Sequence, residues 1–507
     1  MLLTLVLGMS LCAGQVETPT PANSGKAALL PPEPAAQTDK KDKDKDATPQ
    51  ERTHFLRAFL KAYADEFKKK DDSGDDSTPP ARRALPEPWS SPPFPGHEFQ
   101  GYPLIGVPAS TDTYPFMKAF YDCTAGTPFG ECVKESKIKV DGWLVGSYNF
   151  STAKVSNLPS SYWVVPNRAE LDQGVIRIAR DMDTVQTDHI DWGFRCINLY
   201  GIDYRYTTAG GWASDQLLRN NRLYGYDPTE QYFDLYIPWV AQGMVIRVGR
   251  WIACPDIETQ YGPDNYMGSH SLLFTYDSYT QTGVMLTFKL SDQLMVQGAI
   301  HAGTDMAPWY PGATATGFFG IRWVAPDNNN AVYTCLNNIN DARFRRLEID
   351  GQTAGHDNFN YLVSTWEHRF NENVHTKTEA YFMWQRDAYV GGTVSVGPPQ
   401  SFGGGGGAGA FIPGYSLNYG LVNFTMVGLS KKDYLTFRNE LWNDPQGERT
   451  GYRSLFSTHS VGWTHHFSSV FQIRPEIGFY HSYNERAFDL GATRNMLMGG
   501  FDAIWRF

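Results

Sequence analysis

The chain has 507 residues and a formal net charge of −10; 19% of its residues are charged and 14% are aromatic. The acidic balance, without a basic stripe, argues against a nucleic acid partner. No internal apolar run reaches about 18 residues, which excludes a transmembrane helix. A membrane-crossing β-strand stays open, because it needs only about ten residues of alternating character.

The first fourteen residues have the character of an export signal. Leu2 to Leu11 forms a short apolar run before Ala13 and Gly14, which predicts a secretory signal peptide over residues 1–14. The positive charges expected at its start are missing, so the true start codon is open. Cys12 leaves lipidation as an alternative, with Leu11 an unfavourable residue before it.

A helix between two linkers is expected next. Residues 15–50 are rich in Pro, Ala and Thr and predict a disordered linker. Within residues 51–70, aromatic side chains recur every four residues, which predicts an amphipathic helix; they are Phe55, Phe59, Tyr63 and Phe67. This helix either docks on a neighbour, with self-association as one form, or lies on a membrane surface. Residues 71–137 are interpreted as a second linker and a periplasmic loop region.

Residues 138–507 repeat a β pattern. Short segments rich in aromatic and β-branched residues are separated by turn-forming residues. The expected strands are 138–150, 171–181, 188–200, 230–238, 243–251, 281–290, 293–302, 315–325, 331–340, 357–370, 373–386, 415–429, 431–442, 453–467, 469–483 and 494–507. Their connections alternate between short turns and long loops, which is the layout of a transmembrane barrel. We therefore predict an all-β fold, an antiparallel transmembrane β-barrel of about 16 strands.

The expected strands alternate between apolar and charged residues. In 434–442, Leu435, Phe437 and Leu441 oppose Arg438 and Glu440. A wall between lipid and water explains this pattern, and so does a soluble sheet with one wet face. The charged faces supply the candidate pore-lining residues, which either tune solute selection or pair across strands: Arg369, Lys377, Glu379, Arg438, Glu440, Arg474 and Glu476. We also expect the loop around Asp305, Trp309 and Tyr310 to fold inward as a constriction.

The chain ends in an aromatic strand. Phe501, Trp505 and Phe507 share one face of the segment 494–507. This ending resembles the closing strand of bacterial outer-membrane barrels, whose C-terminal Phe is read by the insertion machinery. We expect the strand to pair antiparallel with residues 138–150.

Neither the cysteine spacing nor any sequence motif indicates a catalytic or metal site. Cys123 and Cys132 lie in a loop containing Gly and Pro, where either a disulfide or two thiols would fit. The other cysteines lack metal-ligand spacing, and no nucleophile elbow or zinc-protease motif is present. The run Gly403 to Gly407 lacks the Lys-Ser/Thr of a phosphate loop. We expect no catalytic, metal or cofactor site and no enzyme activity.

Two stretches resemble a known family. They are Leu171-Asp172-Gln173-Gly174-Val175-Ile176-Arg177, and Asp191-Trp192-Gly193-Phe194-Arg195 running on to Tyr200-Gly201-Ile202-Asp203. Both are similar to elements of the family known as putative β-barrel porin-2, with Asp172 where the family has Asn. The resemblance covers roughly residues 138–507 and implies a porin-like pore of the outer membrane.

The expected function is passive diffusion of small hydrophilic solutes or ions through an outer-membrane channel, with the N-terminal region in the periplasm. The expected partners are outer-membrane lipid, the barrel insertion machinery and the solutes. Nothing in the sequence requires a homo-oligomer or excludes one. The alternative function is a secreted or surface β-rich binding protein, carbohydrate-binding or adhesive, without channel activity.

Overall fold

The computed structural model describes residues 54–68, 105–106, 109, 113–391 and 409–507, apart from 161, 219, 221, 254–256, 350–351 and 357. The predicted signal peptide and the linker over residues 15–50 lie outside these ranges. So does the run Gly403 to Gly407.

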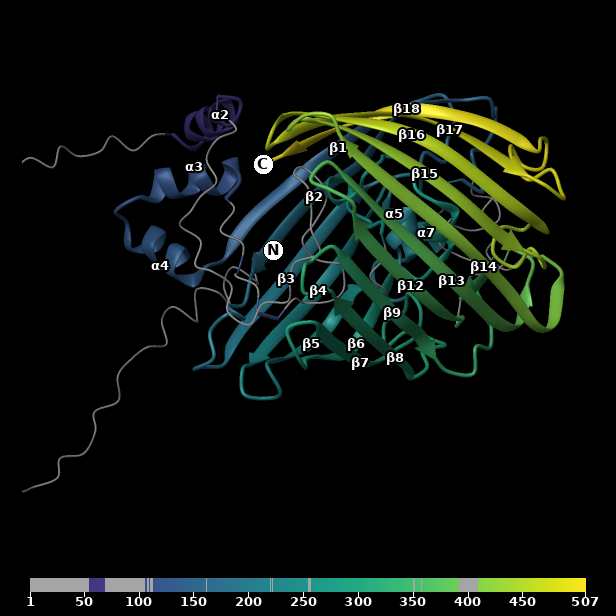
Figure 1. Cartoon of the computed structure of the whole chain (residues 1–507), viewed down its shortest axis with the longest axis horizontal. Helices are drawn as coiled ribbons and strands as arrows, with labels where there is room; N and C mark the ends of the chain where they lie inside the picture. Colours follow the sequence, from purple (N-terminus) through teal and green to yellow (C-terminus); the bar gives the residue numbers. More distant parts are fainter. Residues whose placement is uncertain are drawn as a thin grey trace, which may run out of the picture.

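The strands close into one antiparallel barrel (Figure 1). Its strands are β1 (Lys139–Ser151), β2 (Ala169–Arg180), β3 (Asp191–Gly201), β4 (Gly225–Ile237), β5 (Met244–Ile252), β6 (Thr280–Lys289), β7 (Leu294–His301), β8 (Thr316–Val324), β9 (Asn330–Ile339), β12 (Asn360–Arg369), β13 (Val374–Tyr389), β14 (Phe411–Gly428), β15 (Asp433–Asp444), β16 (Ser454–Ser468), β17 (Phe471–Ser482) and β18 (Asn495–Arg506). A separate ribbon, β10 (Arg345–Ile349) and β11 (Gln352–His356), lies between β9 and β12 in the chain. The predicted sixteen-stranded barrel is confirmed.

The first and last strands close the barrel. β1 and β18 pair antiparallel, with Leu144 opposite Trp505 and Tyr148 opposite Phe501. Gly142 and Phe507 exchange two backbone hydrogen bonds, of 3.2 and 2.9 Å, at the end of the ladder. The predicted pairing of the terminal strand with the first strand is confirmed, and the barrel therefore has no free edge.

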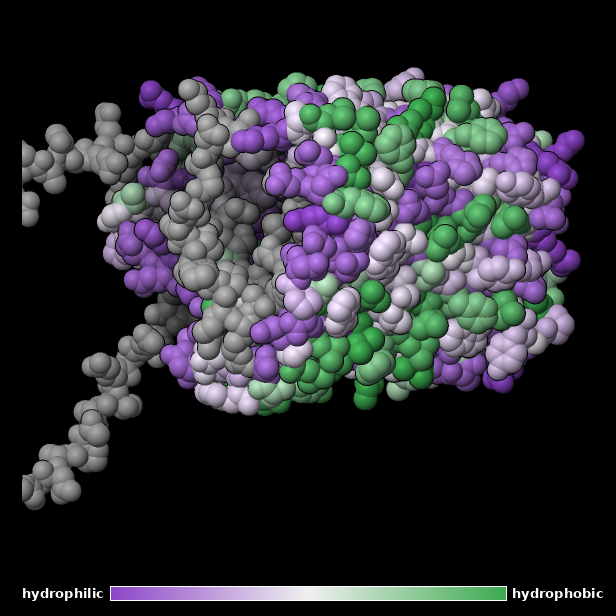
Figure 2. Space-filling view, in the orientation of Figure 1, coloured by the Kyte–Doolittle hydropathy of each residue, from purple (hydrophilic) through white to green (hydrophobic). Residues whose placement is uncertain are grey.

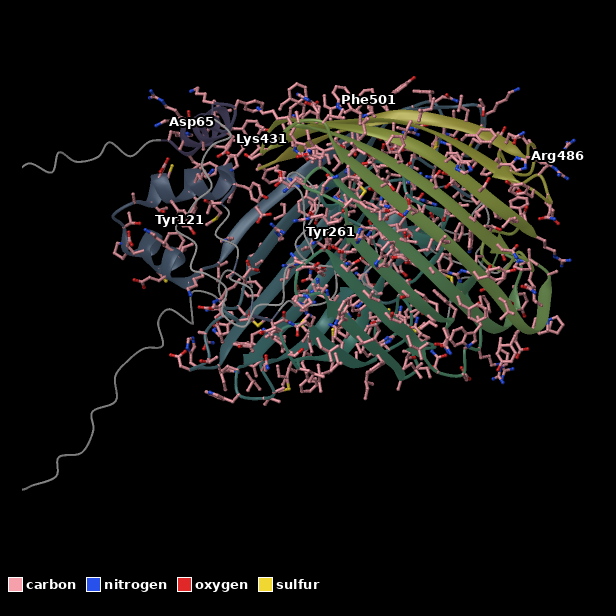
Figure 3. All side chains as sticks on the ribbon, in the orientation of Figure 1. Asp65, Tyr121, Tyr261, Lys431, Arg486 and Phe501 are labelled. Atoms are coloured by element: carbon pink, nitrogen blue, oxygen red, sulfur yellow. The ribbon has the colours of Figure 1, made fainter. Side chains whose placement is uncertain are left out.

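Side chains alternate between the lumen and the outer surface. On β15, Arg438 is fully buried inside the barrel, whereas Leu441 is 51% exposed outside it. Phe501 and Trp505 of β18 are also exposed on the outer face, and apolar residues cover much of the barrel wall (Figures 2 and 3). An apolar outer face around a polar interior follows from the period of two residues in each strand.

The two ends of the barrel differ in their connections. Short turns such as 290–293, 370–373 and 469–470 lie at one end, here called the inner end. Long loops such as 202–224 and 253–279 lie at the other, the outer end. The long loops contain the short helices α5 (Tyr204–Thr207), α6 (Asp215–Leu218), η1 (Gly262–Asp264) and α7 (Leu272–Tyr276). The sequence pattern predicted none of these helices, because they are too short to show a period.

Three helices stand at the inner end beside the C-terminus (Figure 1). They are α2 (Phe55–Glu66), which confirms a helix within residues 51–70, α3 (Pro115–Thr124) and α4 (Pro128–Ser136). The last two lie in the region interpreted as linker and loop. Both α3 and α4 begin with a proline. The Thr127 hydroxyl caps α4 by accepting a hydrogen bond from Gly130 N at 3.0 Å. None of the described helices is long and apolar enough to cross a membrane.

Polar contacts fasten these helices to the barrel. Glu66 of α2 forms an ion pair with Lys118 of α3. Glu66 also accepts a hydrogen bond from Ser469, in the turn between β16 and β17, at 2.7 Å. Cys123 lies in α3 and Cys132 in α4, so neither cysteine lies in the open loop that the sequence suggested. Their pairing with each other stays a prediction.

Substitution of Gly500 should weaken barrel closure. A Cβ at Gly500 would lie 2.4 Å from the carbonyl oxygen of Tyr148 on β1, so Gly500→Ala forces the β1–β18 ladder apart. Crowding of this kind costs about 1–3 kcal/mol. The matched control is Gly298→Ala on β7, where a Cβ meets nothing within 4 Å. On an unheated gel, we expect a smaller share of the Gly500→Ala protein than of the Gly298→Ala protein to migrate as the folded form. Equal shares of the folded form in the two variants would show that Gly500 is not needed for barrel closure.

Candidate functional site

One long loop fills the middle of the barrel. Its described part, residues 257–279, is here called the inward loop, and nearly all of its residues are buried. It contains η1 and α7. Tyr261 of this loop lies within the barrel, while Phe501 marks the outer face (Figure 3). The lumen is therefore narrowed from within by its own chain.

Two glutamates of the wall bind backbone N–H groups of the inward loop. Glu476 on β17 accepts from Gly268 N at 3.0 Å and from Ser269 N at 3.2 Å. Glu440 on β15 accepts from the first two N–H groups of α7, at 3.0 and 2.8 Å. Buried backbone donors need partners, and charged acceptors form the stronger bonds. The two carboxylates thus hold the central part of the loop.

Two arginines bind carbonyl groups of the same loop. Arg438 on β15 donates to the Ser269 carbonyl at 2.7 Å and to its hydroxyl at 3.0 Å. Arg474 on β17 donates to the carbonyl of Asn265, and Asp502 on β18 holds its guanidinium group from the other side at 2.9 Å. The strands β15 and β17, with β16 between them, therefore supply both acceptors and donors to one irregular segment.

Further anchors stand on β2 and β13. The Gln173 amide donates to the Gln260 carbonyl at 2.6 Å and accepts from Gly262 N at 3.0 Å. Glu379 accepts from Ile257 N at 3.1 Å. The loop is thus tied to wall strands on several sides of the lumen.

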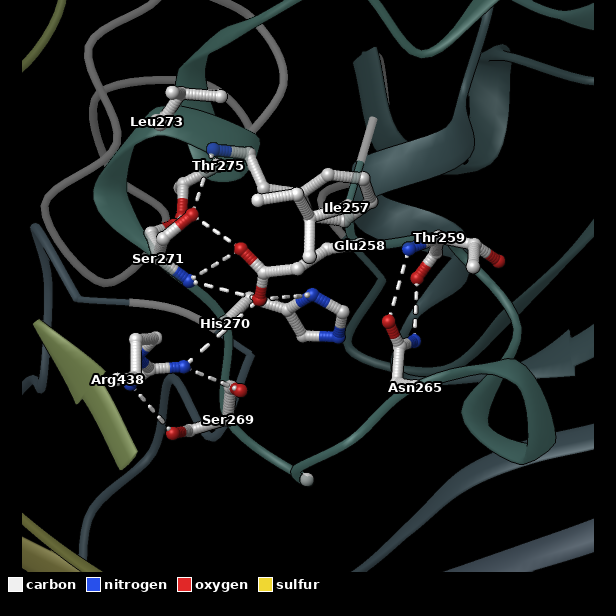
Figure 4. A network of polar contacts seen from close by, with 12 residues as sticks. Ile257, Glu258, Thr259, Asn265, Ser269, His270, Ser271, Leu273, Thr275 and Arg438 are labelled. Atoms are coloured by element: carbon white, nitrogen blue, oxygen red, sulfur yellow. Dashed lines mark hydrogen bonds and ion pairs between the residues drawn. The ribbon is translucent and has the colours of Figure 1, made fainter. Parts of the chain in front are cut away.

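Within the loop, Glu258 and His270 form a buried polar centre (Figure 4). His270 Nδ1 lies 3.2 Å from a Glu258 oxygen, and Ser271 N donates to Glu258 at 3.1 Å. Burial alone would raise the pKa of Glu258, but His270, Arg438 and Ser271 together lower it below its ordinary value. Burial lowers the pKa of His270. The charged and hydrogen-bonding neighbours of Glu258 therefore favour its carboxylate form.

Aromatic stacking ties three outer loops together. Tyr162 from the loop 152–168 stacks on Tyr206 of α5, with ring centroids 4.1 Å apart. Tyr162 also stacks on His270, with ring centroids 3.8 Å apart. His270 in turn stacks on Phe274, with ring centroids 4.7 Å apart. Stacked rings add packing energy beyond their buried area. The column stiffens the outer side of the inward loop.

The structure brings together most of the predicted pore-lining residues. Five of them contact the inward loop by hydrogen bonds: Glu379, Arg438, Glu440, Arg474 and Glu476. Lys377 lies 3.3 Å from Glu367, and its ammonium group stands 5.6 Å from the Tyr266 ring of the loop. Arg369 stands apart at the inner end of β12. A role of any of them in solute selection stays a prediction.

The predicted constriction loop is wrong. Trp309 is 63% exposed at the outer end and packs on Trp212 at 5.0 Å, so it does not enter the lumen. Asp305 is buried, but it accepts from Thr280 N at the start of β6. Sequence reasoning missed Glu258 and His270, because the inward loop has no period and its residues gain meaning only from the wall that surrounds them.

Within the described ranges, no three His, Cys, Asp or Glu side chains lie together so as to hold a metal ion. The polar groups of the lumen instead bind backbone groups and one another.

Comparisons with known proteins give a family. The family model described as "Putative beta-barrel porin-2, OmpL-like" matches residues 137–507. No curated protein sequence matches the chain.

Several solved structures are similar to the chain at low sequence identity. The anion-selective porin from Comamonas acidovorans is 7% identical, with a TM-score of 0.47, over 73% of this chain and 99% of that one. The outer membrane channel DcaP of Acinetobacter baumannii is 7% identical, with a TM-score of 0.43, over 73% and 97%. OmpT of Vibrio cholerae, in a trimer form, is 10% identical, with a TM-score of 0.44, over 73% and 99%. The family match covers most of the chain, and the chain therefore belongs to the putative beta-barrel porin-2 family.

Proposed function

We propose that this protein is an outer-membrane channel through which small hydrophilic solutes and ions diffuse passively, with the inward loop as its constriction. The observation that carries the proposal is the inward loop itself, held across a polar lumen by Glu440, Glu476, Arg438 and Arg474. A barrel of sixteen strands is wide enough for an aqueous lumen. A loop folded into such a lumen limits the size of what passes.

The two faces of the wall support a membrane location. Exposed outer residues such as Phe437, Leu441, Leu497 and Phe501 form a surface that lipid would cover. A protein secreted into water would expose this apolar area to solvent and aggregate. The closed barrel also differs from the sandwich expected of a carbohydrate-binding module. These features favour the channel over the alternative of a secreted binding protein.

The ends of the barrel suggest its orientation. Transmembrane barrels carry short turns in the periplasm and long loops outside the cell. By that layout the inner end, with α2, α3 and α4, lies in the periplasm. The exposed side chains Arg57, Lys61 and Leu60 of α2 would then face the periplasmic space.

Purified folded protein should conduct ions. When it is added to a planar lipid bilayer, we expect discrete steps of current, because an anchored constriction leaves a fixed passage. Protein unfolded by heating is the control and should give no steps. Folded protein, verified by its altered mobility on an unheated gel, that repeatedly gives no steps would overturn the channel proposal.

Release of the inward loop should widen the passage. The double variant Glu440→Ala and Glu476→Ala removes the acceptors of four backbone N–H groups, three of them buried and that of Gly268 half-buried. Each buried N–H group left unsatisfied costs about 1–3 kcal/mol. We expect larger and noisier current steps, together with faster amide hydrogen exchange in residues 268–273.

The matched control for this variant is Glu135→Ala on α4, an exposed glutamate outside the barrel. Its steps should equal those of the unmodified protein. Unchanged steps in the double variant, with faster exchange in the loop, would show that the loop does not limit the current.

A further inference from the structure

Polar side chains cross the outer face of one wall of the barrel. The strands β13, β14, β15 and β16 lie side by side in this wall (Figure 1). On them, Thr378, Asn423, Asn439 and His459 lie directly opposite one another in register. Each of the four stands between two buried residues of its strand and therefore points outwards. These four residues are here called the polar row.

The polar row lies inside the apolar band of the wall. Asn439 stands near the middle of β15, between Phe437, which is 40% exposed, and Leu441, which is 51% exposed. At the two ends of the row, Trp366 on β12 and Phe479 on β17 are the next residues in register, and both are exposed. Exposed apolar side chains thus surround the row, which places it at the depth of the lipid tails.

The wall formed by β5, β6, β7 and β8 gives the contrast. Every residue of these strands is described, and the outward side chains near the strand middles are apolar: Ile246, Val248, Val284, Leu286, Phe319 and Ile321. A wall that meets only lipid needs no polar groups, and a polar group without a partner in hydrocarbon costs free energy. A protein surface that covers the polar row explains it better than lipid does.

Half of the row is satisfied within the wall. The Asn423 amide donates to the Thr378 hydroxyl at 2.8 Å and accepts from the Thr425 hydroxyl at 3.1 Å. In the other half, His459 Nδ1 lies 2.8 Å from Asn439 Oδ1, and among the described residues this is the one side-chain hydrogen bond of either residue. When Nδ1 donates in this contact, His459 Nε2 can still accept and the Asn439 amide can still donate.

We propose that the β13–β16 face docks on the same face of a second copy of this chain, polar row against polar row. This inference rests on the membrane location that belongs to the proposed function. A two-fold axis along the membrane normal, passing between Asn439 and His459, brings the rows together. The Asn439 amide of each copy then donates to His459 Nε2 of the other, and Phe437 and Leu441 pack around these two bonds.

Two features of the row favour a second copy over an unlike protein. Copies inserted in the same orientation carry their rows at the same depth, so each row meets its counterpart without any tilt of the barrel. The row also holds one free donor, on Asn439, beside one free acceptor, on His459, which makes it complementary to itself. Within a membrane, such hydrogen bonds between side chains stabilise association.

Site-specific photo-cross-linking locates the interface. The photoreactive residue p-benzoylphenylalanine replaces Leu441 beside the row, or Val284 on β6, in the full-length protein in its native membrane. On irradiation we expect a product of twice the chain mass from position 441, composed of this chain alone by mass spectrometry, and none from position 284. Equal products from both positions, a product with a different protein, or a product with lipid alone would overturn the proposal.

Removal of the polar groups should weaken the association. Asn439→Leu with His459→Leu leaves side chains that suit lipid, so the barrel should still fold, as its mobility on an unheated gel will show. Hydrogen bonds between side chains in a membrane each strengthen association about threefold. Loss of two symmetric bonds should therefore lower the association constant in mild detergent roughly tenfold, measured by analytical ultracentrifugation.

The matched control is Val248→Leu with Val284→Leu, a directly opposed pair on β5 and β6. It also introduces two leucines on the outer surface, but on the apolar wall, and should keep the association constant of the unmodified protein. Equal association constants for the two double variants would overturn the role of the polar row.

The outcomes separate this inference from the proposed channel function. Folded protein that stays monomeric in the membrane and gives current steps would overturn the interface and leave the channel intact. A cross-linked pair that gives no current steps would overturn the channel and leave the interface. Recovery of the folded protein in the soluble fraction would overturn both.

Discussion

The antiparallel pairing of β1 with β18 is the constraint on which the rest of the structure depends. Within lipid, each backbone N–H and C=O group must find its partner inside the protein, and only a closed ladder gives every strand two neighbours. The pairs Leu144–Trp505 and Tyr148–Phe501 close that ladder. In the closed barrel, successive side chains of each strand point alternately into the lumen and towards the lipid. The polar side chains of the strands therefore form the interior.

The same constraint explains the wall charges around the inward loop. The loop is irregular backbone at the depth of the membrane, which is tolerated only where protein groups satisfy it. Glu440 and Glu476 accept from its N–H groups, while Arg438 and Arg474 donate to its carbonyls. The first role of these four charged side chains is therefore to hold the backbone of the inward loop.

By itself, the sequence determined the strands, their number and the face that each residue takes, because a strand's period of two is local and the chain repeats it from residue 138 to Phe507. It also determined the polar faces that carry Arg438 and Glu440. Only the tertiary structure decided which loop enters the lumen, since Trp309 and Tyr266 both stand in aromatic loops of similar composition. The register and curvature of the closed wall bring Glu440 opposite α7, and no local pattern encodes a distance across the barrel.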